Sequence, residues 1–373
     1  MGESESVFQI GASIVTIISR YITKEFLKLF SLVLLSFLSI YLIVDFFERI
    51  RMFLSNQASI GQMASYFLYT LPMIVAQAIP VSVLLATLLT FGMFSKNHEL
   101  VALKASGISM YRASVPVLSI AVVACLLVFI LNEFVTPYTN QMARQIKLVE
   151  IQKQKKTGVF KQNRVWFRAK NSIYSFTIFD PEKNTLQGIS IHYFDPGFAL
   201  TRRIDARSAD WKGDHWEFFD VLVTQFSEGH LPSIERLDSM MIDIPEEPSD
   251  FQVVQKSADE MGYLELRGYI RKIKEEGYDV TRYEADLHGK IAFTLVSIFV
   301  VMVGIAFSMR PERSGGVAQG VGVGLIIGFS YWLLFALCLS LGRSGTLAPM
   351  LSAWLPNLIF GSISAYLFKG IQT

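Results

Sequence analysis

Cysteine is almost absent from this chain of 373 residues, which contains only Cys125 and Cys338. Both lie inside long apolar runs, where a cysteine serves most simply as a small packing residue. These two residues provide neither a disulfide framework nor a metal site. Excess charge is absent too, because 34 basic and 32 acidic residues leave a net charge of +2. Nothing in this balance points to nucleic-acid binding.

Catalytic motifs are also missing. The sequence has no phosphate-binding loop ending in Gly-Lys, no His-Glu-x-x-His pair and no Gly-x-Ser-x-Gly turn. The histidines are scattered without the spacing of metal ligands: His98, His192, His215, His230 and His288. We therefore expect a protein that is not an enzyme and that binds no metal or cofactor. If it moves a substrate, a partner supplies the energy.

Charge is scarce inside the long apolar runs. Asp45, near the end of the first run, is the one charged residue deep in any of them. A proton-driven transporter would carry a relay of such residues, so this mechanism is disfavoured. Each run has roughly the 20 residues that a helix needs to cross a membrane. The runs are Leu27 to Phe47, Tyr66 to Phe94, Ala113 to Phe134, Ile291 to Met309, Gly316 to Leu341 and Pro349 to Phe368.

The order of the runs predicts the architecture. Three runs precede a polar interval of about 150 residues and three follow it, and continuous runs of this length are helices rather than barrel strands. We expect a membrane α-helical protein with six transmembrane helices, three on each side of one inserted domain. The predicted boundaries are 1–136 for the first membrane half, 137–289 for the inserted domain and 290–373 for the second half.

Basic residues in short loops predict the orientation, since they accumulate on the cytoplasmic side. Few lie in the opposite loops, namely Arg49, Arg51 and Arg343. We therefore expect both termini in the cytoplasm and the inserted domain in a periplasm or an equivalent compartment. The first 18 residues lack the basic start and cleavage site of a secretory signal, so we expect no cleavage. The cytoplasmic set is Arg20, Lys24, Lys28, Lys96, Lys104, Arg112, Arg310, Arg313 and Lys369.

The inserted domain reads as β structure in its central part. Short runs rich in β-branched and aromatic residues alternate with turn residues such as Asp195-Pro196-Gly197 and Lys212-Gly213-Asp214. A spacing of about ten residues favours a sandwich or jelly roll. Ser257 and Glu260 then form a capping-box pattern before a helix that ends by Gly277. The predicted strands are Val165 to Ala169, Ile173 to Phe179, Gly188 to Phe194, Thr201 to Trp211 and Trp216 to Phe226.

The loop between the second and third runs has helix-forming character. We expect a short cytoplasmic helix at about 95–108, with charged ends, a small apolar face and Gly107 at its C-terminal end. One interpretation is a helical linker with a solvated face. The other is a coupling helix that sits in a groove of a cytosolic ATPase.

With this layout and the motifs below, the sequence resembles the LptF/LptG permeases of lipopolysaccharide export. The resemblance covers nearly the whole chain, through the three-domain-three layout and several local motifs. These motifs are Glu99 to Gly107, Arg310, Gly315-Gly316, Gly342-Arg343-Ser344-Gly345 and Trp354-Leu355-Pro356-Asn357. The stretch from Tyr283 to Phe293 favours the LptG branch.

Membership in this family implies a set of partners. It implies one of two paralogous permease subunits that form a heterodimer, bound to a dimeric cytosolic ATPase that uses ATP and Mg. It also implies a single-span protein with a periplasmic jelly roll, a periplasmic bridge, and lipopolysaccharide as cargo. The location would be the bacterial inner membrane, with the inserted jelly roll in the periplasm.

The resemblance also implies residue roles. By position, Glu99 would meet the ATPase, and Leu103, Ala105 and Gly107 would complete that contact. The first and fifth spans would line a lateral gate for the lipid. Some members carry a lysine in the outer half of the first span, where this chain has Leu42. Any phosphate contact therefore falls to other residues.

Physical reasoning adds further candidates. Arginine forms forked bonds with phosphate, so Arg49, Arg51 and Arg343 are candidates for lipid phosphates, although such residues also anchor helix ends. The glycines of the fifth span recur at every fourth position, a stripe that allows either close packing or a moving gate. The stripe is Gly316, Gly320, Gly324 and Gly328, and the aromatic candidates for acyl contact or packing are Phe37, Phe46, Phe329 and Trp332.

The function expected from sequence is thus a permease subunit of an ABC-type exporter. It would extract lipopolysaccharide from the inner membrane and pass it to a periplasmic bridge toward the outer membrane. Two alternatives stay open. One is an ABC permease for another lipid or a lipoprotein, and the other is a membrane anchor that recruits periplasmic partners without transport.

Overall fold

The computed structural model describes residues 2–153, 158–161, 164–168, 172–180, 183–226, 231–242, 244, 247–248, 251, 256–275, 277–308 and 317–369. Several positions used above lie outside these ranges: Ala169, His230, Met309, Arg310, Arg313, Gly315 and Gly316. The chain divides into two compact units. The membrane unit contains Met1–Met52, Phe67–Asn140 and Thr281–Thr373, and the β unit contains Phe53–Tyr66 and Gln141–Val280.

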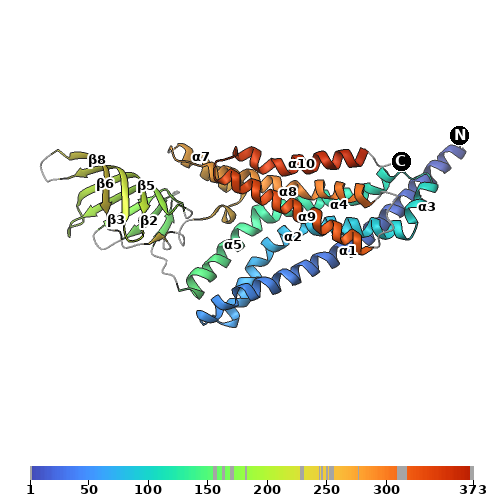
Figure 1. Ribbon diagram of the computed structural model, residues 1–373, viewed down its shortest axis with the longest axis horizontal. Helices are drawn as coiled ribbons and strands as arrows, with labels where there is room; N and C mark the ends of the chain where they lie inside the picture. Colours follow the sequence, from blue (N-terminus) through green and yellow to red (C-terminus); the bar gives the residue numbers. More distant parts are fainter. Residues whose placement is uncertain are drawn as a thin grey trace. The chain divides into compact units, whose positions relative to one another are not determined.

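Six helices among the described residues are long and apolar enough to cross a membrane, and Figure 1 shows them as long coiled ribbons. The predicted class, six membrane helices with an inserted β domain, is therefore confirmed. The short helix α3 (Glu99–Ala105) joins the second and third of them. The six are α1 (Gly2–Ser55), α2 (Ile60–Lys96), the helix that begins with α4 (Met110–Ile130), α8 (Thr281–Ser308), α9 (Val317–Arg343) and α10 (Pro349–Lys369).

The third of these helices runs beyond the apolar segment. After α4 come η1 (Leu131–Val135), α5 (Thr136–Gln145) and η2 (Ile146–Ile151) without a break. Pro137 sits near the start of α5 and has no N–H to donate. The wider π turn of η1 directly precedes it, which accommodates the missing backbone hydrogen bond without ending the helix.

The membrane unit has its core around α2. Buried residues of α2, including Ile79, Val83 and Phe91, pack with apolar side chains of α1, α4 and α8 in one cluster. A second cluster joins Leu84 and Leu88 of α2 to α8 and α9. The helix α8 also packs against α4, α9 and α10 (Figure 1). By contrast, α1 and α9 leave many large apolar side chains exposed, as lipid-facing or partner-facing helices do.

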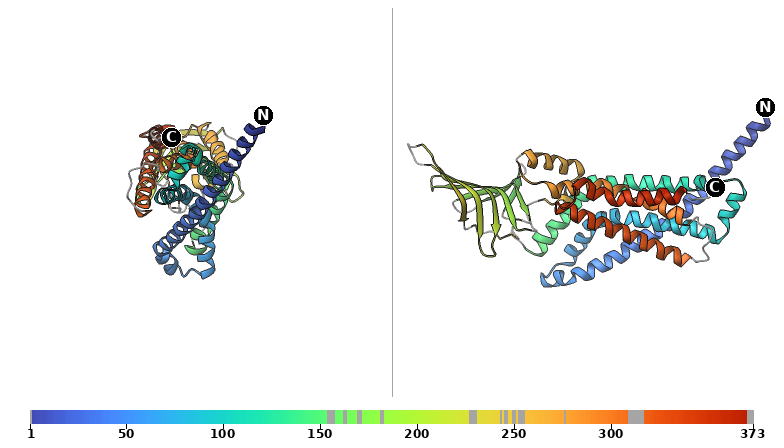
Figure 2. Two further views of the ribbon diagram at one scale, coloured as in Figure 1. Left: turned by 90° about the vertical axis from the view of Figure 1, so that its right-hand side faces the viewer. Right: turned by 45° about the horizontal axis from the view of Figure 1, so that its top comes forward.

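The β unit is built on one antiparallel eight-stranded sheet of the described residues. Its order follows the chain, β1-β2-β3-β5-β6-β7-β8, and β4 pairs with β5. Figure 2 shows the sheet as strongly curved. The described strands lack the crossing connections of a jelly roll made from two Greek keys. They are β1 (Gly158–Lys161), β2 (Arg164–Arg168), β3 (Ser172–Phe176), β4 (Ile178–Asp180), β5 (Thr185–Phe194), β6 (Leu200–Trp211), β7 (Trp216–Gln225) and β8 (Ser233–Ile242).

One face of this sheet is filled with apolar side chains. Alternate residues of neighbouring strands, such as Phe167, Phe176 and Phe218, form a single buried cluster. Phe251, which follows the last strand, is fully buried in it. Its ring contacts those of Phe167, Phe176, Phe179 and Trp216, with centroids 4.9–5.8 Å apart. The inner face is therefore occupied by the chain itself.

Two short helices follow the sheet. The predicted capping box exists, but Ser257 and Glu260 form it on the 3-10 turn η3 (Ala258–Glu260). The helix α7 (Tyr263–Glu275) begins three residues later and buries Leu266, Ile270 and Ile273. Arg144 and Gln141 of α5 bind Glu260, each at 2.8 Å. These contacts tie the segment before the sheet to the segment after it.

Candidate functional site

The short helix α3 has well-defined ends. His98 precedes it with a positive φ of 59°. At the other end Gly107 has a φ of +76° and its N–H donates to the Lys104 carbonyl, while Ile108 N–H donates to Leu103. This pair of bonds is the Schellman motif, which favours glycine at that position. Gly107 thus has a structural role in ending α3, whatever surface it also presents.

The side chains of α3 divide into an inner and an outer set. Leu100 is buried in the core cluster of the membrane unit, and Leu103 packs against the same cluster. Ala105 is exposed, and so is Val101, with 62% of its surface accessible. Of the sequence-predicted contact residues, Leu103 therefore faces the core. Val101 was missed, although an apolar residue two positions after Glu99 on a short polar-ended helix is a detectable signal.

Glu99 itself is held from two directions. Its Oε2 accepts a hydrogen bond from the Tyr21 hydroxyl of α1 at 3.2 Å, and its Oε1 accepts one from Asn97 at 3.2 Å. The residue as a whole is half-buried, and both of these hydrogen bonds are exposed to solvent. No sequence spacing predicts the Tyr21 contact, because the two residues are 78 positions apart.

Two of the three phosphate candidates have carboxylate partners. Arg49 Nε lies 2.8 Å from Asp45 Oδ1 one turn earlier in α1, and the Asp45 side chain is only 6% exposed. Arg343 Nε lies 2.7 Å from Oδ1 of Asp286 in α8, whose side chain is 9% exposed. Arg51 is exposed and makes no ion pair with any residue that the structure describes. Arg51 is consequently the candidate best placed to bind an external phosphate.

Two glycines of the stripe, Gly324 and Gly328, face α2. A Cβ built on Gly324 would lie 2.5 Å from Leu85 Cδ2 and from Leu88 Cδ1. One built on Gly328 would lie 3.6 Å from Val81. Gly320 lies in α9, and Gly316 is outside the described residues. Gly324 and Gly328 thus allow close packing inside this subunit.

The aromatic candidates occupy different surroundings. Phe329 and Trp332 of α9 stack with centroids 6.3 Å apart and are 62% and 56% exposed. Phe46 contacts Phe67 of α2 with centroids 6.0 Å apart, and Phe37 is half-buried. Only the pair on α9 offers a broad apolar surface outward.

A buried polar network joins α8, α9 and α10. The Tyr331 hydroxyl donates to Asn357 Oδ1 at 2.7 Å, and Asn357 Nδ2 donates to the Ala292 carbonyl at 2.7 Å. Asn357 is the last residue of the Trp-Leu-Pro-Asn motif. Because polar groups in apolar surroundings need partners, this motif positions α9 against its neighbours.

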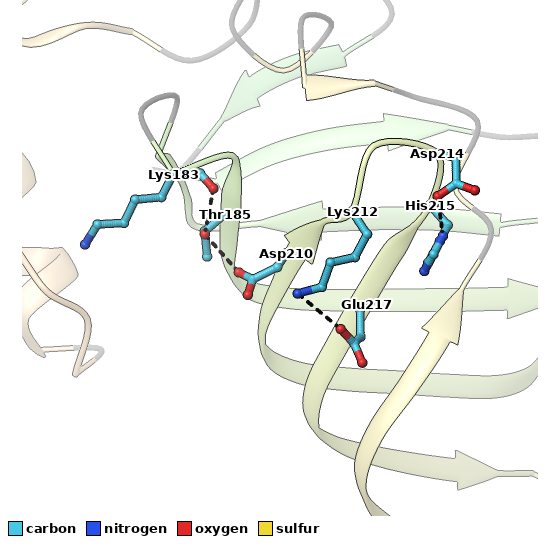
Figure 3. Close-up of polar contacts among 7 residues, drawn as sticks. All are labelled: Lys183, Thr185, Asp210, Lys212, Asp214, His215 and Glu217. Carbon is cyan, nitrogen blue, oxygen red and sulfur yellow. Dashed lines mark hydrogen bonds and ion pairs between the residues drawn. The ribbon is translucent and has the colours of Figure 1, made fainter.

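One end of the β sheet carries polar contacts, which Figure 3 shows. Thr185 donates to Asp210 at 2.9 Å, and Lys212 pairs with Glu217 at 3.3 Å. They tie adjacent strands together. Among the residues that the structure describes, no group of three or more His, Cys, Asp or Glu side chains is arranged to hold a metal ion.

Comparison with known proteins decides the family. The profile of the family described as "Lipopolysaccharide export system permease LptF/LptG" matches residues 20–370. This chain belongs to that family. The sequence-based assignment to the LptF/LptG permeases of lipopolysaccharide export is thereby confirmed, and with it the general function of a lipopolysaccharide export permease.

Curated relatives agree with this assignment over nearly their whole length. The chain is 25% identical over 356 residues to the lipopolysaccharide export system permease protein LptG of Escherichia coli K12, which covers 94% of this chain and 97% of the relative. It is 23% identical over 350 residues to the protein of the same name from Haemophilus influenzae, covering 92% and 95%. An LptF/LptG permease with this layout is a multi-span membrane protein.

Proposed function

We propose that this LptF/LptG permease is one subunit of an ABC-type exporter. It extracts lipopolysaccharide from the outer leaflet of the inner membrane and passes it to a periplasmic bridge. The observation that carries the proposal is the family match over residues 20–370, with α3 lying between the second and third spans. The similarity to relatives named LptG favours that branch.

The energy source in this proposal is a dimeric cytosolic ATPase that binds ATP and Mg. The chain has no phosphate-binding loop of its own. α3 offers the ATPase the half-exposed Glu99 in its first turn, and Val101 and Ala105, which are exposed and lie one turn apart on one face of the helix. Gly107 ends the helix, and Leu103 anchors α3 to the core of the membrane unit.

The proposed membrane partners are a paralogous permease subunit and a single-span protein with a periplasmic jelly roll. Exposed apolar side chains along α1 and α9, among them Phe329 and Trp332, supply a surface for the lipid and the paralogue. Arg51 supplies a guanidinium group for a lipid phosphate. In this scheme α1 and α9 line the lateral gate, and the β unit receives the lipid in the periplasm.

The proposed orientation places both termini in the cytoplasm of a bacterial inner membrane. The support is the excess of lysine and arginine on the side of the chain termini and of α3. This orientation puts α3 where an ATPase can reach it. It also puts Arg49, Arg51 and Arg343 at the outer surface, beside lipid phosphates.

Purification of the chain in mild detergent followed by mass spectrometry of proteins and lipids tests the proposal. We expect an ATPase, a sister permease and lipopolysaccharide. An ATPase with a different lipid would favour the alternative of another cargo. Recovery without an ATPase, together with full function of a Glu99→Lys variant, would favour the membrane anchor.

A further inference from the structure

The carboxylate of Glu99 is not positioned by α3 alone. Its two oxygens accept hydrogen bonds from different segments, Oε1 from Asn97 in the turn and Oε2 from Tyr21 in α1, both at 3.2 Å. Asn97 belongs to the loop that carries Glu99, whereas Tyr21 belongs to a separate long helix. A side chain of α1 therefore reaches the residue that is proposed to contact the ATPase.

The ring of Tyr21 is itself held in place. It stacks on Phe94 at the end of α2, with centroids 5.4 Å apart and planes 17° apart. Phe94 in turn contacts Phe91 edge-on at 6.3 Å, and both phenylalanines are buried. Since stacking restricts the orientation of the ring, the hydroxyl is directed at Glu99 by the end of α2.

The turn of α1 that carries Tyr21 also contributes to the core cluster that α3 enters. Ile22 and Phe26 of α1 are buried in the cluster that contains Leu100 of α3. The hydrogen bond from Tyr21 thus joins α1 to α3 at Glu99, and both helices also contribute to the same apolar cluster.

We propose that Tyr21 is a positioning residue that orients the Glu99 carboxylate toward the ATPase. This inference rests on the proposed function. An unheld glutamate samples several rotamers, and fixing one of them on binding costs conformational entropy. Tyr21 reduces that cost by holding the rotamer in advance.

Tyr21→Phe provides the test, because it removes the hydroxyl and keeps the ring on Phe94. The purified ATPase subunit is titrated into nanodiscs that contain the permease pair and lipopolysaccharide, and ATP hydrolysis is measured. We expect the half-saturating ATPase concentration to rise about two- to tenfold, the range for the entropy of ordering one side chain on binding. The maximal rate at saturation should remain close to that of the wild type.

Glu99→Gln and the double variant decide whether Tyr21 acts through Glu99. We expect Glu99→Gln to raise the half-saturating concentration and Tyr21→Phe to add nothing in that background. Tyr366→Phe, at an exposed tyrosine of α10, is the matched control and should behave as the wild type.

Three results would overturn the inference. They are an unchanged half-saturating concentration in Tyr21→Phe, independent and additive losses in the double variant, or a lower maximal rate alone, which indicates damaged folding. If Glu99→Gln itself has no effect, the proposed contact between Glu99 and the ATPase fails, and the positioning role fails with it. An intact Glu99 effect with a silent Tyr21→Phe rejects only the positioning role.

Discussion

At the residue scale, the carboxylate partner of Arg343 changes the role assigned to this residue. Arg343 is a candidate for lipid phosphate by its position, yet its Nε lies 2.7 Å from a nearly buried Asp286. An aspartate at such a site needs a counter-charge, since an unpaired buried carboxylate is costly. Arg343 therefore has a structural task that exists without lipid.

We predict that Arg343→Gln lowers the free energy of unfolding by about 1.5–3 kcal/mol, the range for a hydrogen bond to a charged group. Adding Asp286→Asn should recover part of the loss, because it removes a nearly buried charge that has lost one of its partners. Thermal unfolding of the detergent-purified protein measures both effects. Weaker binding of lipopolysaccharide with unchanged thermal stability would assign Arg343 to the lipid instead.

His192 gives the β unit a pH dependence. Burial lowers the pKa of His192, and the charge of Arg203 on the neighbouring strand lowers it further. The folded state therefore binds the proton less well than the unfolded state does, whose pKa is about 6.5. The contribution of neutral His192 to stability is fully present above the pKa of the unfolded state. It declines as the pH falls through that value toward the lower pKa of the folded state.

We predict that the β unit is less stable to unfolding at pH 5.5 than at pH 7.5. The difference in stability between the two pH values should be smaller in His192→Gln. Hydrogen exchange of β3, β5 and β6 at the two pH values reports this unit within the full chain. Equal pH dependence in the variant and the wild type would show that other groups are responsible.

Phe251 fills the inner face of the curved sheet. We predict that Phe251→Ala destabilises the β unit by about 3–5 kcal/mol, as for other buried phenylalanines. Leu231→Ala, at a side chain that is 93% exposed, is the control and should have little effect. Hydrogen exchange of the sheet measures the difference. Equal protection in the two variants would mean that the sheet does not depend on this ring.

At the element scale, α9 presents Gly324 and Gly328 to α2, and Phe329 and Trp332 outward. A bulky side chain at Gly324 would impair transport under the gate hypothesis, but it would also collide with Leu85 and Leu88 inside the subunit. Such a variant cannot separate a gate from a packing contact. The smallest substitution, with a control on the opposite face, is the better test of packing.

We predict that Gly324→Ala lowers thermal stability by about 1–3 kcal/mol, the usual cost of overpacking. Gly322→Ala should be neutral or slightly stabilising, because a Cβ there has no heavy atom within 4 Å and alanine favours the helix. Thermal unfolding in detergent compares the two. A stable Gly324→Ala variant with impaired export would favour the moving gate.

The sequence predicted those elements whose side chains follow a clear pattern. The apolar runs located all six spans, and short runs rich in β-branched and aromatic residues between turn residues located β5, β6 and β7 to within a few residues. β8 was missed because its exposed, charged sequence, with Glu235, Arg236 and Asp238, lacks a continuous apolar face. β1 is only four residues long, and short strands carry little pattern.

Contacts between distant segments were not predictable from one sequence. The pairing of Tyr21 with Glu99, or of Asp286 with Arg343, depends on how the helices pack. Local chemistry was more informative, since Gly107 and the Ser257-Glu260 box were identified from spacing alone. The order of the strands in the sheet was likewise not predictable, because the periodicity of the sequence does not show which strands pair.

At the scale of the whole molecule, the orientation in the membrane is open to a direct test. The chain has two native cysteines, and both are buried. Single cysteines introduced at the exposed positions Asn97 and Lys183 are therefore selective targets for a membrane-impermeant maleimide.

We predict labelling of Lys183→Cys in intact cells whose outer membrane is permeabilised. Asn97→Cys should react only after the inner membrane is opened, because α3 is expected in the cytoplasm. The wild type is the background control. The reverse pattern would invert the proposed topology and remove α3 from reach of a cytosolic ATPase.

The length of α1 has a mechanical consequence. Tyr21 and Arg49 are 28 positions apart on one helix, and no glycine or proline lies between them. At 1.5 Å per residue they are separated by about 42 Å, and the stretch has no residue of the kind that kinks helices. A tilt of about 10° at the Tyr21 level would displace the Arg49 level by about 7 Å. α1 thus has the dimensions of a lever that converts a small tilt on one side of the bilayer into a displacement of lipid-headgroup size on the other.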